Sequence, residues 1–391
     1  MYSKSRFGAV LEGLSRGGFD RLVQAHATDK HSKGFGSWDH LLAMLYSQLA
    51  GCRSLRDIES GFNEQTRHHY HLGTRPIRRS TLADANRKRS PAVFEQLCGQ
   101  LMASVRGRLK AEMRDLLYLI DSTPIPLKGK GYDDWVNGQQ GNRTQGLKVH
   151  LMIASGATSL PVEQVISAAN INDIDVGRGF SIETGATYVF DKGYYDYNWW
   201  HRLDEAGAVF VTRLKRNASV ERIGTHSESA DTRILIDECI QFRNKRPGGQ
   251  RINRYHGRPL RRVVVTRPDK PTPLVLVTND FQRPAEVIAE LYKQRWEIEL
   301  FFKWLKQNLK IKRFLGQSEN AVKIQLYTAL IAYLLVYHYR QRHGETKTLA
   351  LVLSALRVSL FSRHNTDTTV SQRERRQREY MAELQPSLLP A

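Results

Sequence analysis

Four polar residues in the last third of the chain are spaced so that one helix would carry them on a single narrow face: Tyr292, Arg295, Glu299 and Lys306. Since each helical residue advances by about 100°, the other three fall within about 40° of Glu299. A carboxylate bordered by two cations and a phenol suits a phosphodiester, because the carboxylate can bind a metal ion while the cations neutralise phosphate oxygens. The simpler alternative is a surface ion pair between Arg295 and Glu299, which stabilises a helix by roughly a few tenths of a kcal/mol.

Two aspartates each follow a run of apolar residues that predicts a buried strand. Leu116–Ile120 leads into Asp121, and Thr187–Phe190 leads into Asp191. Carboxylates at the ends of neighbouring strands converge on one place, and hard divalent cations prefer such oxygen ligands. Either aspartate alone is explained equally well as a turn residue or a helix N-cap, so the pair by itself leaves both interpretations open.

Three other aspartates lie near these two in the sequence. Asp196 is a rival of Asp191, but no predicted strand runs into it. Asp173 and Asp175 come too early to replace Asp191, and we interpret them as solvated residues at the start of a helix. The expected acidic set is therefore Asp121, Asp191 and Glu299.

The first part of the chain, residues 1–110, predicts an all-helical domain. Trp38–Ala50 has apolar residues at helical spacing. Ser54 with Asp57 three residues later predicts the capped start of another helix, and Ser90-Pro91 the start of a third. Between them lies a basic stretch, and we expect its charged side chains to bind DNA. The candidates are Arg75, Arg78, Arg79, Arg87 and Lys88.

The remaining chain predicts a mixed α/β domain with additions. Residues 111–214 read as its first part, with strands at 147–154, 162–167 and 209–214 besides those that precede the aspartates, and a helical segment at 199–206. Residues 215–273 read as a β-rich insertion of short segments separated by turns. Residues 274–315 resume the domain and include one long helix from about Pro284 to about Leu309 that carries Glu299. Residues 316–364 predict C-terminal helices, and 365–391 a disordered tail or isolated helix.

Composition favours a protein that binds a polyanion. Lys and Arg number 59 against 39 Asp and Glu, for a formal net charge of +20, and nucleic acid is the commonest polyanion. Three widely separated cysteines argue against a disulfide scaffold or a structural zinc site. The chain begins without a visible secretory signal, and its most apolar window, Ile324–Tyr337, is too short to span a bilayer. We therefore expect a cytoplasmic protein without a membrane partner.

The spacing Tyr-x2-Arg-x3-Glu-x6-Lys resembles, residue for residue, the signature helix of the insertion-sequence-4 family of bacterial DDE transposases. The surroundings of the aspartates, Leu119-Ile120-Asp121-Ser122-Thr123 and Phe190-Asp191-Lys192-Gly193-Tyr194, are similar to that family as well. The resemblance covers roughly residues 30 to 340, and the helix signature is its most specific part.

This resemblance implies a ribonuclease-H-like catalytic domain with a β-rich insertion, between a helical DNA-binding domain and C-terminal helices. Asp121, Asp191 and Glu299 would bind two Mg²⁺ ions, which Mn²⁺ can replace, and Tyr292, Arg295 and Lys306 would bind DNA phosphates. The enzyme would excise and integrate an insertion sequence at its terminal inverted repeats.

The partners implied are double-stranded DNA of the element ends and of the target, and a second copy of the chain in a synaptic complex. The compartment implied is the prokaryotic cytoplasm, where the enzyme acts on the nucleoid. A base is flipped out of the duplex in such reactions, and an aromatic side chain receives it. The candidates are Trp296, Tyr255, Trp199 and Trp200.

Two other functions compete with transposition. One is a nuclease of the same fold that cuts without joining, but it would need no end-recognition domain. The other is a catalytically silent, domesticated DNA-binding protein, but Asp121, Asp191, Glu299 and the two flanking cations are all present. A strand-transfer assay separates the three functions.

Overall fold

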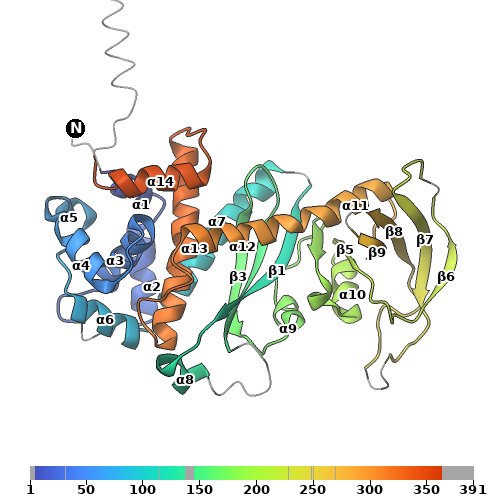
Figure 1. Cartoon of the computed structure of the whole chain (residues 1–391), viewed down its shortest axis with the longest axis horizontal. Helices are drawn as coiled ribbons and strands as arrows, with labels where there is room; N and C mark the ends of the chain where they lie inside the picture. Colours follow the sequence, from blue (N-terminus) through green and yellow to red (C-terminus); the bar gives the residue numbers. More distant parts are fainter. Residues whose placement is uncertain are drawn as a thin grey trace, which may run out of the picture. The chain divides into compact units, whose positions relative to one another are not determined.

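The computed structural model of the protein describes most of the chain (Figure 1). The described ranges are 5–30, 32–113, 115–136, 145–227, 229–247, 249, 251–268 and 270–362. The predicted tail at 365–391 lies outside them. The chain forms two compact units, one of residues 1–85 and 335–391, the other of residues 86–334.

The first unit is helical. Its helices are α1 (Arg6–Leu11), α2 (Arg16–Ala25), α3 (Ser37–Ala50), α4 (Leu55–Asn63), α5 (Thr66–Leu72), α14 (Leu349–Ser359), most of α6 (Arg79–Lys88) and the last part of α13 (Glu319–Arg342). The apolar α3 is buried almost throughout, so it forms the core. At the start of α4 the Ser54 hydroxyl accepts from the amide of Asp57, and the Asp57 carboxylate accepts from the amide of Ser54. The predicted capping box is therefore confirmed.

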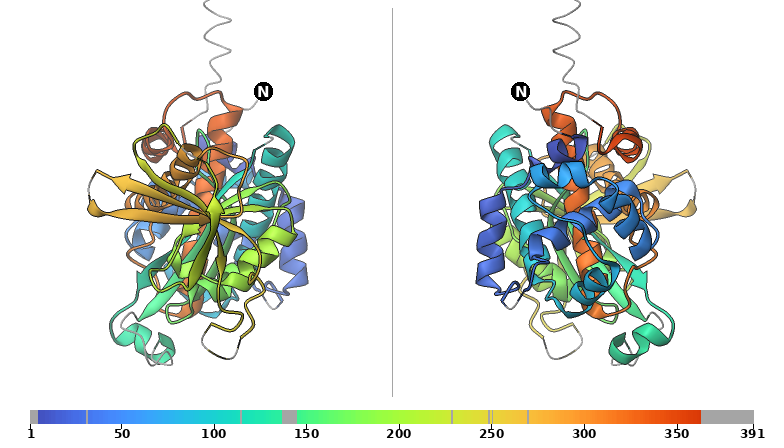
Figure 2. Two further views of the ribbon diagram at one scale, coloured as in Figure 1. Left: turned by 90° about the vertical axis from the view of Figure 1, so that its right-hand side faces the viewer. Right: turned by 90° about the vertical axis from the view of Figure 1, so that its left-hand side faces the viewer.

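The second unit is built on one nine-stranded mixed sheet, which confirms the expected α/β class. Its strands are β1 (Leu117–Pro126), β2 (Gly146–Ala154), β3 (Leu160–Ala168), β4 (Thr187–Phe190), β5 (Val209–Arg213), β6 (Val220–Thr225), β7 (Ile234–Phe242), β8 (Leu260–Arg267) and β9 (Lys270–Thr278). Their order is β3-β2-β1-β4-β5-β9-β8-β7-β6, with β1, β4 and β5 parallel and the other pairs antiparallel. The side views of Figure 2 show these strands fanned out by the twist of the sheet.

The β segments predicted within residues 215–273 extend this sheet. The strand β9 pairs on one side with β5, where Arg213 lies opposite Leu276, and on the other side with β8. The strands β6, β7 and β8 therefore continue the ladder that carries β1 and β4.

The strand β1 does not end at Asp121, contrary to the prediction. The strand β4 pairs with β1 only as far as Ile120, whereas β2 pairs with it as far as Pro126. Pro124 and Pro126 are tolerated because a strand that is paired on one side only can lack amide donors. Asp121 thus lies within a strand, at the point where its parallel neighbour stops.

Helices and short turns complete the second unit. They are α7 (Ala92–Glu112), α8 (Lys130–Val136), α9 (Asp173–Gly177), the 3-10 turn η1 (Lys192–Tyr194), α10 (Tyr197–Glu205), α11 (Ala285–Gln294), α12 (Trp296–Asn308) and the first part of α13. The helix α12 packs against β1, and α11 against β5 and β8. Figure 1 shows α11 and α12 following one another across the strands.

The prediction of one unbroken helix through Glu299 is wrong. The helices α11 and α12 meet at Arg295, where the amide of Arg295 donates to the carbonyl of Tyr292 and the amide of Ile298 to that of Arg295. Hydrogen bonds between residues three apart form a tighter turn than an α-helix. The regular advance of about 100° per residue is therefore interrupted between Tyr292 and Glu299.

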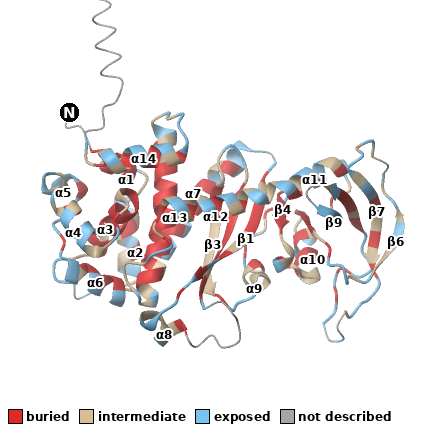
Figure 3. Cartoon of the chain, viewed as in Figure 1, coloured by how far each residue is buried: buried red, intermediate tan, exposed pale blue. Residues whose placement is uncertain are grey.

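The helix α13 contains Ile324–Tyr337, the most apolar window of the sequence. It is the one described helix long and apolar enough to cross a membrane, but 89% of its most apolar window is buried within the protein. Figure 3 shows α13 and β1 as largely buried elements. The burial of α13 fits a core helix.

Candidate active site

The register between β1 and β4 brings Asp121 and Asp191 side by side. Ile120 pairs with Phe190, and the two aspartates are the next residues on each chain. Neighbouring strands lie about 4.8 Å apart, and residues at the same register point to the same face. Each carboxylate accepts from the amide that follows it, Asp121 from Ser122 at 2.8 Å and Asp191 from Lys192 at 2.6 Å.

Arg295 connects Glu299 to Asp121 by contacting both carboxylates. The Arg295 guanidinium lies 2.7 Å from the Glu299 Oε1 and 3.5 Å from the Asp121 Oδ2. Only 13% of the Arg295 side chain is exposed, so this contact is well shielded from water. It joins the helix α12 to the strand β1 by charge, beyond the apolar packing between them.

The pKa of Asp121 reflects its burial and the charges around it. The pKa of Asp121 is raised to about 6, chiefly by burial and further by the charges of Asp191 and Glu299. The amide of Ser122 and the guanidinium of Arg295 act in the opposite direction. Burial, with the two neighbouring carboxylates, therefore outweighs these opposing effects on the pKa of Asp121.

The residues suit a hard divalent cation by their chemistry. Within the described ranges, no three His, Cys, Asp or Glu side chains are already grouped closely enough to bind a metal ion. Instead, Arg295 supplies the positive charge between Asp121 and Glu299. Carboxylate oxygens are the donors such an ion prefers, so the set fits the ion by the chemistry of its donors, with Arg295 in contact with two of its members.

The other two residues of the signature also lie here. The Lys306 Nζ donates to the Thr123 Oγ1 at 2.6 Å, two residues after Asp121. Tyr292 is buried, which raises its pKa, and the charges of Arg295, Asp191 and Arg213 act on its hydroxyl. The interrupted helix therefore still directs both side chains toward the aspartates.

Arg213 is a cation of this site that the sequence analysis missed. It ends β5, and its guanidinium lies 3.9 Å from the Asp191 Oδ1. Because Val189 pairs with Val211, Arg213 stands opposite Asp191 across the parallel ladder. A basic residue at the end of the next predicted strand was the available signal.

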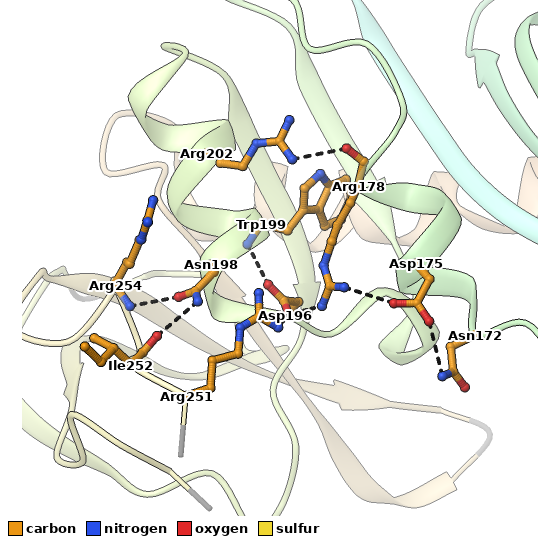
Figure 4. Close-up of polar contacts among 10 residues, drawn as sticks. All are labelled: Asn172, Asp175, Arg178, Asp196, Asn198, Trp199, Arg202, Arg251, Ile252 and Arg254. Carbon is orange, nitrogen blue, oxygen red and sulfur yellow. Dashed lines mark hydrogen bonds and ion pairs between the residues drawn. The ribbon is translucent and has the colours of Figure 1, made fainter. Parts of the chain in front are cut away.

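Asp196, the rival for the second position, is fully engaged elsewhere (Figure 4). Its Oδ1 accepts from the amide of Trp199 at 2.7 Å and caps α10. Its Oδ2 lies 2.6 Å from Arg178 and 2.9 Å from Arg251. This carboxylate ties α10 to the loop that holds Arg251 and has little capacity left for another ligand.

Asp173 and Asp175 both lie in the first turn of a helix, α9, as predicted, but only Asp175 is a simple solvated residue. Asp173 forms an ion pair with Lys148 at 3.0 Å and accepts from the hydroxyl of Ser122 at 2.8 Å. It is therefore joined to the residue next to Asp121. Asp175 pairs with Arg178 at the surface.

The candidate aromatic residues for a flipped base separate by exposure. Trp199, Trp200 and Tyr255 are each at most 1% exposed and belong to the core. Trp296 is 58% exposed at the start of α12. A base can stack only on an accessible ring, so three of the four candidates are removed.

The predicted DNA-binding cations are all exposed. Arg75, Arg78 and Arg79 lie before and at the start of α6, whereas Arg87 and Lys88 are in its last turn. At 1.5 Å per residue the ends of α6 are about 13 Å apart. The five residues therefore form two groups along the chain, and DNA binding by them stays a prediction.

Comparison with known proteins gives a consistent result. Residues 112–335 match the family described as transposase DDE domain, and residues 3–75 match a domain of unknown function. A protein of Sinorhizobium fredii named as a transposase, y4zB, is 42% identical over 259 residues, which cover 65% of this chain and 69% of that protein. A Geobacillus stearothermophilus protein named as a transposase for IS5377 is 32% identical over 62% of this chain and 61% of its own length. Transposase InsG for IS4 of Escherichia coli is 30% identical over 40% of this chain and 35% of its own length.

Proposed function

The chain belongs to the family of transposases with a DDE domain, and on this premise we propose that it excises and integrates an insertion sequence by cutting and joining DNA at terminal inverted repeats. The acidic triad of this proposal is Asp121, Asp191 and Glu299. The observation that carries it is the β1–β4 register, which aligns the two aspartates, together with the Arg295 guanidinium that contacts both Asp121 and Glu299.

Divalent ions, Mg²⁺ with Mn²⁺ as a substitute, would be held by the three carboxylates. When bound, such ions activate the attacking hydroxyl and stabilise charge on the leaving oxygen of an in-line displacement. Arg295 would then exchange its carboxylate contacts for phosphate oxygens of the DNA, because a guanidinium binds either group with the same geometry. Lys306, Tyr292 and Arg213 would orient the same phosphates from the surrounding elements.

The topology supports a ribonuclease-H-like catalytic domain. Three antiparallel strands, β3, β2 and β1, continue into the parallel strands β4 and β5, with the triad where β4 ends. We propose catalytic segments at 111–214 and 274–315, a β-rich insertion at 215–273, and C-terminal helices at 316–364 that support pairing of two copies. The helical domain at 1–110 would recognise the terminal repeats with its exposed cations.

Trp296 is the proposed acceptor of a flipped base. It is exposed, and it follows Arg295 directly in the chain, so a base stacked on it would lie beside the phosphate contacts. The enzyme would act on the bacterial nucleoid as a dimer that pairs the two element ends.

The proposal is tested by strand transfer with duplexes carrying the element's terminal repeats. Wild-type protein with Mg²⁺ should cut these ends and join them to target DNA. Asp191→Asn or Glu299→Ala should abolish both reactions and leave end binding within about threefold of wild type. Cutting by either variant would refute the site assignment. Cutting without joining would favour a nuclease, and binding without cutting a silent DNA-binding protein.

A further inference from the structure

Asp173 lies beside the triad without belonging to it. It opens α9, a helix that packs against β1 and η1. Its Oδ1 accepts from the Ser122 hydroxyl at 2.8 Å, and Ser122 is the residue that orients the Asp121 carboxylate through its amide. One acidic side chain thus reaches the strand that carries the first catalytic aspartate.

The same carboxylate also contacts the turn that follows the second catalytic aspartate. A Cβ at Gly193, two residues after Asp191, would lie 2.8 Å from the Asp173 Oδ2, closer than real Cβ atoms come. The backbone of η1 therefore rests directly on the Asp173 side chain. A second close approach joins the same two elements, because a Cβ at Gly177 in α9 would lie 2.6 Å from the ring of Tyr194 in η1.

Charged and polar groups hold Asp173 in place from the neighbouring strand β2. The Lys148 Nζ donates to the Asp173 Oδ1 at 3.0 Å and to the carbonyl of Ile171 at 2.9 Å. The His150 Nδ1 lies 3.7 Å from the same oxygen, and the side chain of His150 is completely buried. Asp173 is thus fixed in its orientation, and its charge is already neutralised by Lys148.

We propose that Asp173 is a positioning residue that links Ser122 on β1 to Gly193 in η1 and thereby sets the separation of Asp121 and Asp191. This inference rests on the proposed function of the triad. Asp173 would act through the two segments it touches, because its own carboxylate is engaged by Lys148 and Ser122. Outer residues that orient metal ligands commonly change metal affinity or activity by about 10- to 100-fold when removed.

Two substitutions at this position separate positioning from general stability. Asp173→Ala and Asp173→Asn both remove the ion pair with Lys148, so a purely structural role predicts similar losses. Asp173→Asn keeps an oxygen that accepts from Ser122 and a side chain of the same shape against Gly193. We therefore expect about a 10- to 100-fold lower cleavage rate for Asp173→Ala and less than about a 5-fold change for Asp173→Asn.

A readout independent of catalysis is the dissociation constant of Mn²⁺ from the full chain, measured by electron paramagnetic resonance without DNA. It should rise at least about tenfold in Asp173→Ala and less than about threefold in Asp173→Asn. The matched control is Asp175→Ala in the same helical turn, which removes surface contacts with Arg178 and Asn172 and should leave Mn²⁺ binding and cleavage unchanged.

Double variants test the two contacts directly. Ser122→Ala should add no further loss in the Asp173→Ala background, because the hydrogen bond is already absent. Gly193→Ala should impair Mn²⁺ binding in the wild-type background, where its Cβ meets the carboxylate, but much less when position 173 is alanine.

The outcomes distinguish this inference from the function on which it rests. Additive losses in these pairs, or equal losses in Asp173→Asn and Asp173→Ala, would overturn the positioning role while wild-type cutting upholds the transposase. Wild-type protein that neither binds Mn²⁺ nor cuts terminal-repeat DNA would overturn both.

Discussion

Replacing Asp121 by asparagine is expected to stabilise the metal-free protein while abolishing its DNA cleavage. Burial and repulsion raise the pKa of Asp121 from 3.8 to about 6. Each pKa unit corresponds to about 1.4 kcal/mol, so the ionised carboxylate costs the folded state about 3 kcal/mol at pH 8. Only 22% of this side chain is exposed, so solvent screens little of that cost. An asparagine keeps an oxygen for the amide of Ser122 and removes the charge.

The sign of the pH dependence follows from the raised pKa. The folded protein holds a proton on Asp121 more tightly than the unfolded chain does, so stability falls as pH rises from about 4 to about 6 and stays low above that. Asp121→Asn lacks this loss. The difference in the free energy of unfolding should therefore be small at pH 4 and reach up to about 3 kcal/mol at pH 8.

The assay is urea unfolding of both proteins across this pH range without divalent ions, and again with Mg²⁺ at pH 8. Mg²⁺ should stabilise the wild-type protein and narrow the difference, because an ion bound to the carboxylates compensates their charge. Asp175→Asn, at a carboxylate that is 48% exposed, serves as the control and should gain no stability. An Asp121→Asn protein no more stable than wild type at pH 8 would refute the argument that the buried Asp121 carboxylate destabilises the folded protein when it is ionised.

Three further predictions concern other parts of the chain. Lys306→Ala should slow strand cleavage by about 10- to 100-fold, because it removes one cation from the phosphate site. This effect is smaller than the loss of a triad carboxylate and is measured by single-turnover rates. A wild-type rate would place Lys306 outside the site. Replacing Arg75, Arg78 and Arg79 together by alanine should make binding to the element ends less sensitive to salt. The slope of the logarithm of the association constant against the logarithm of the salt concentration, measured by fluorescence anisotropy, should become shallower by up to about 2.7. An unchanged slope would mean that these residues do not contact phosphates. Burial lowers the pKa of His150 to about 4, so between about pH 6.5 and pH 4 the unfolded chain binds a proton that the folded protein does not. The free energy of unfolding should therefore fall by about 2 kcal/mol between pH 7 and pH 5. In urea titrations His150→Gln should lose less stability over that range, and an equal loss would contradict the role given to His150.

Sequence alone determined the features that are encoded within a few residues. The capping box of Ser54 and Asp57 was predictable because both partners lie in one helical turn. The apolar runs before Asp121 and Asp191 predicted buried strands, since short continuous runs of this kind are typical of a strand covered on both faces. The spacing of Arg295, Glu299 and Lys306 predicted that their side chains point to one site. It did not predict the break in the helix between α11 and α12.

Tertiary structure decided what depends on pairing between distant segments. The strand β1 continues past Asp121 because β2 pairs with it further than β4 does, and no local pattern contains that difference. Arg213 joins Asp191 only through the parallel register of β4 and β5. Asp173 meets Ser122 although 51 residues separate them in the chain. Helix caps and apolar periodicity are local properties of the backbone, whereas a side chain's charged partners are chosen by the packing of the whole sheet and its helices, and only the folded chain specifies them.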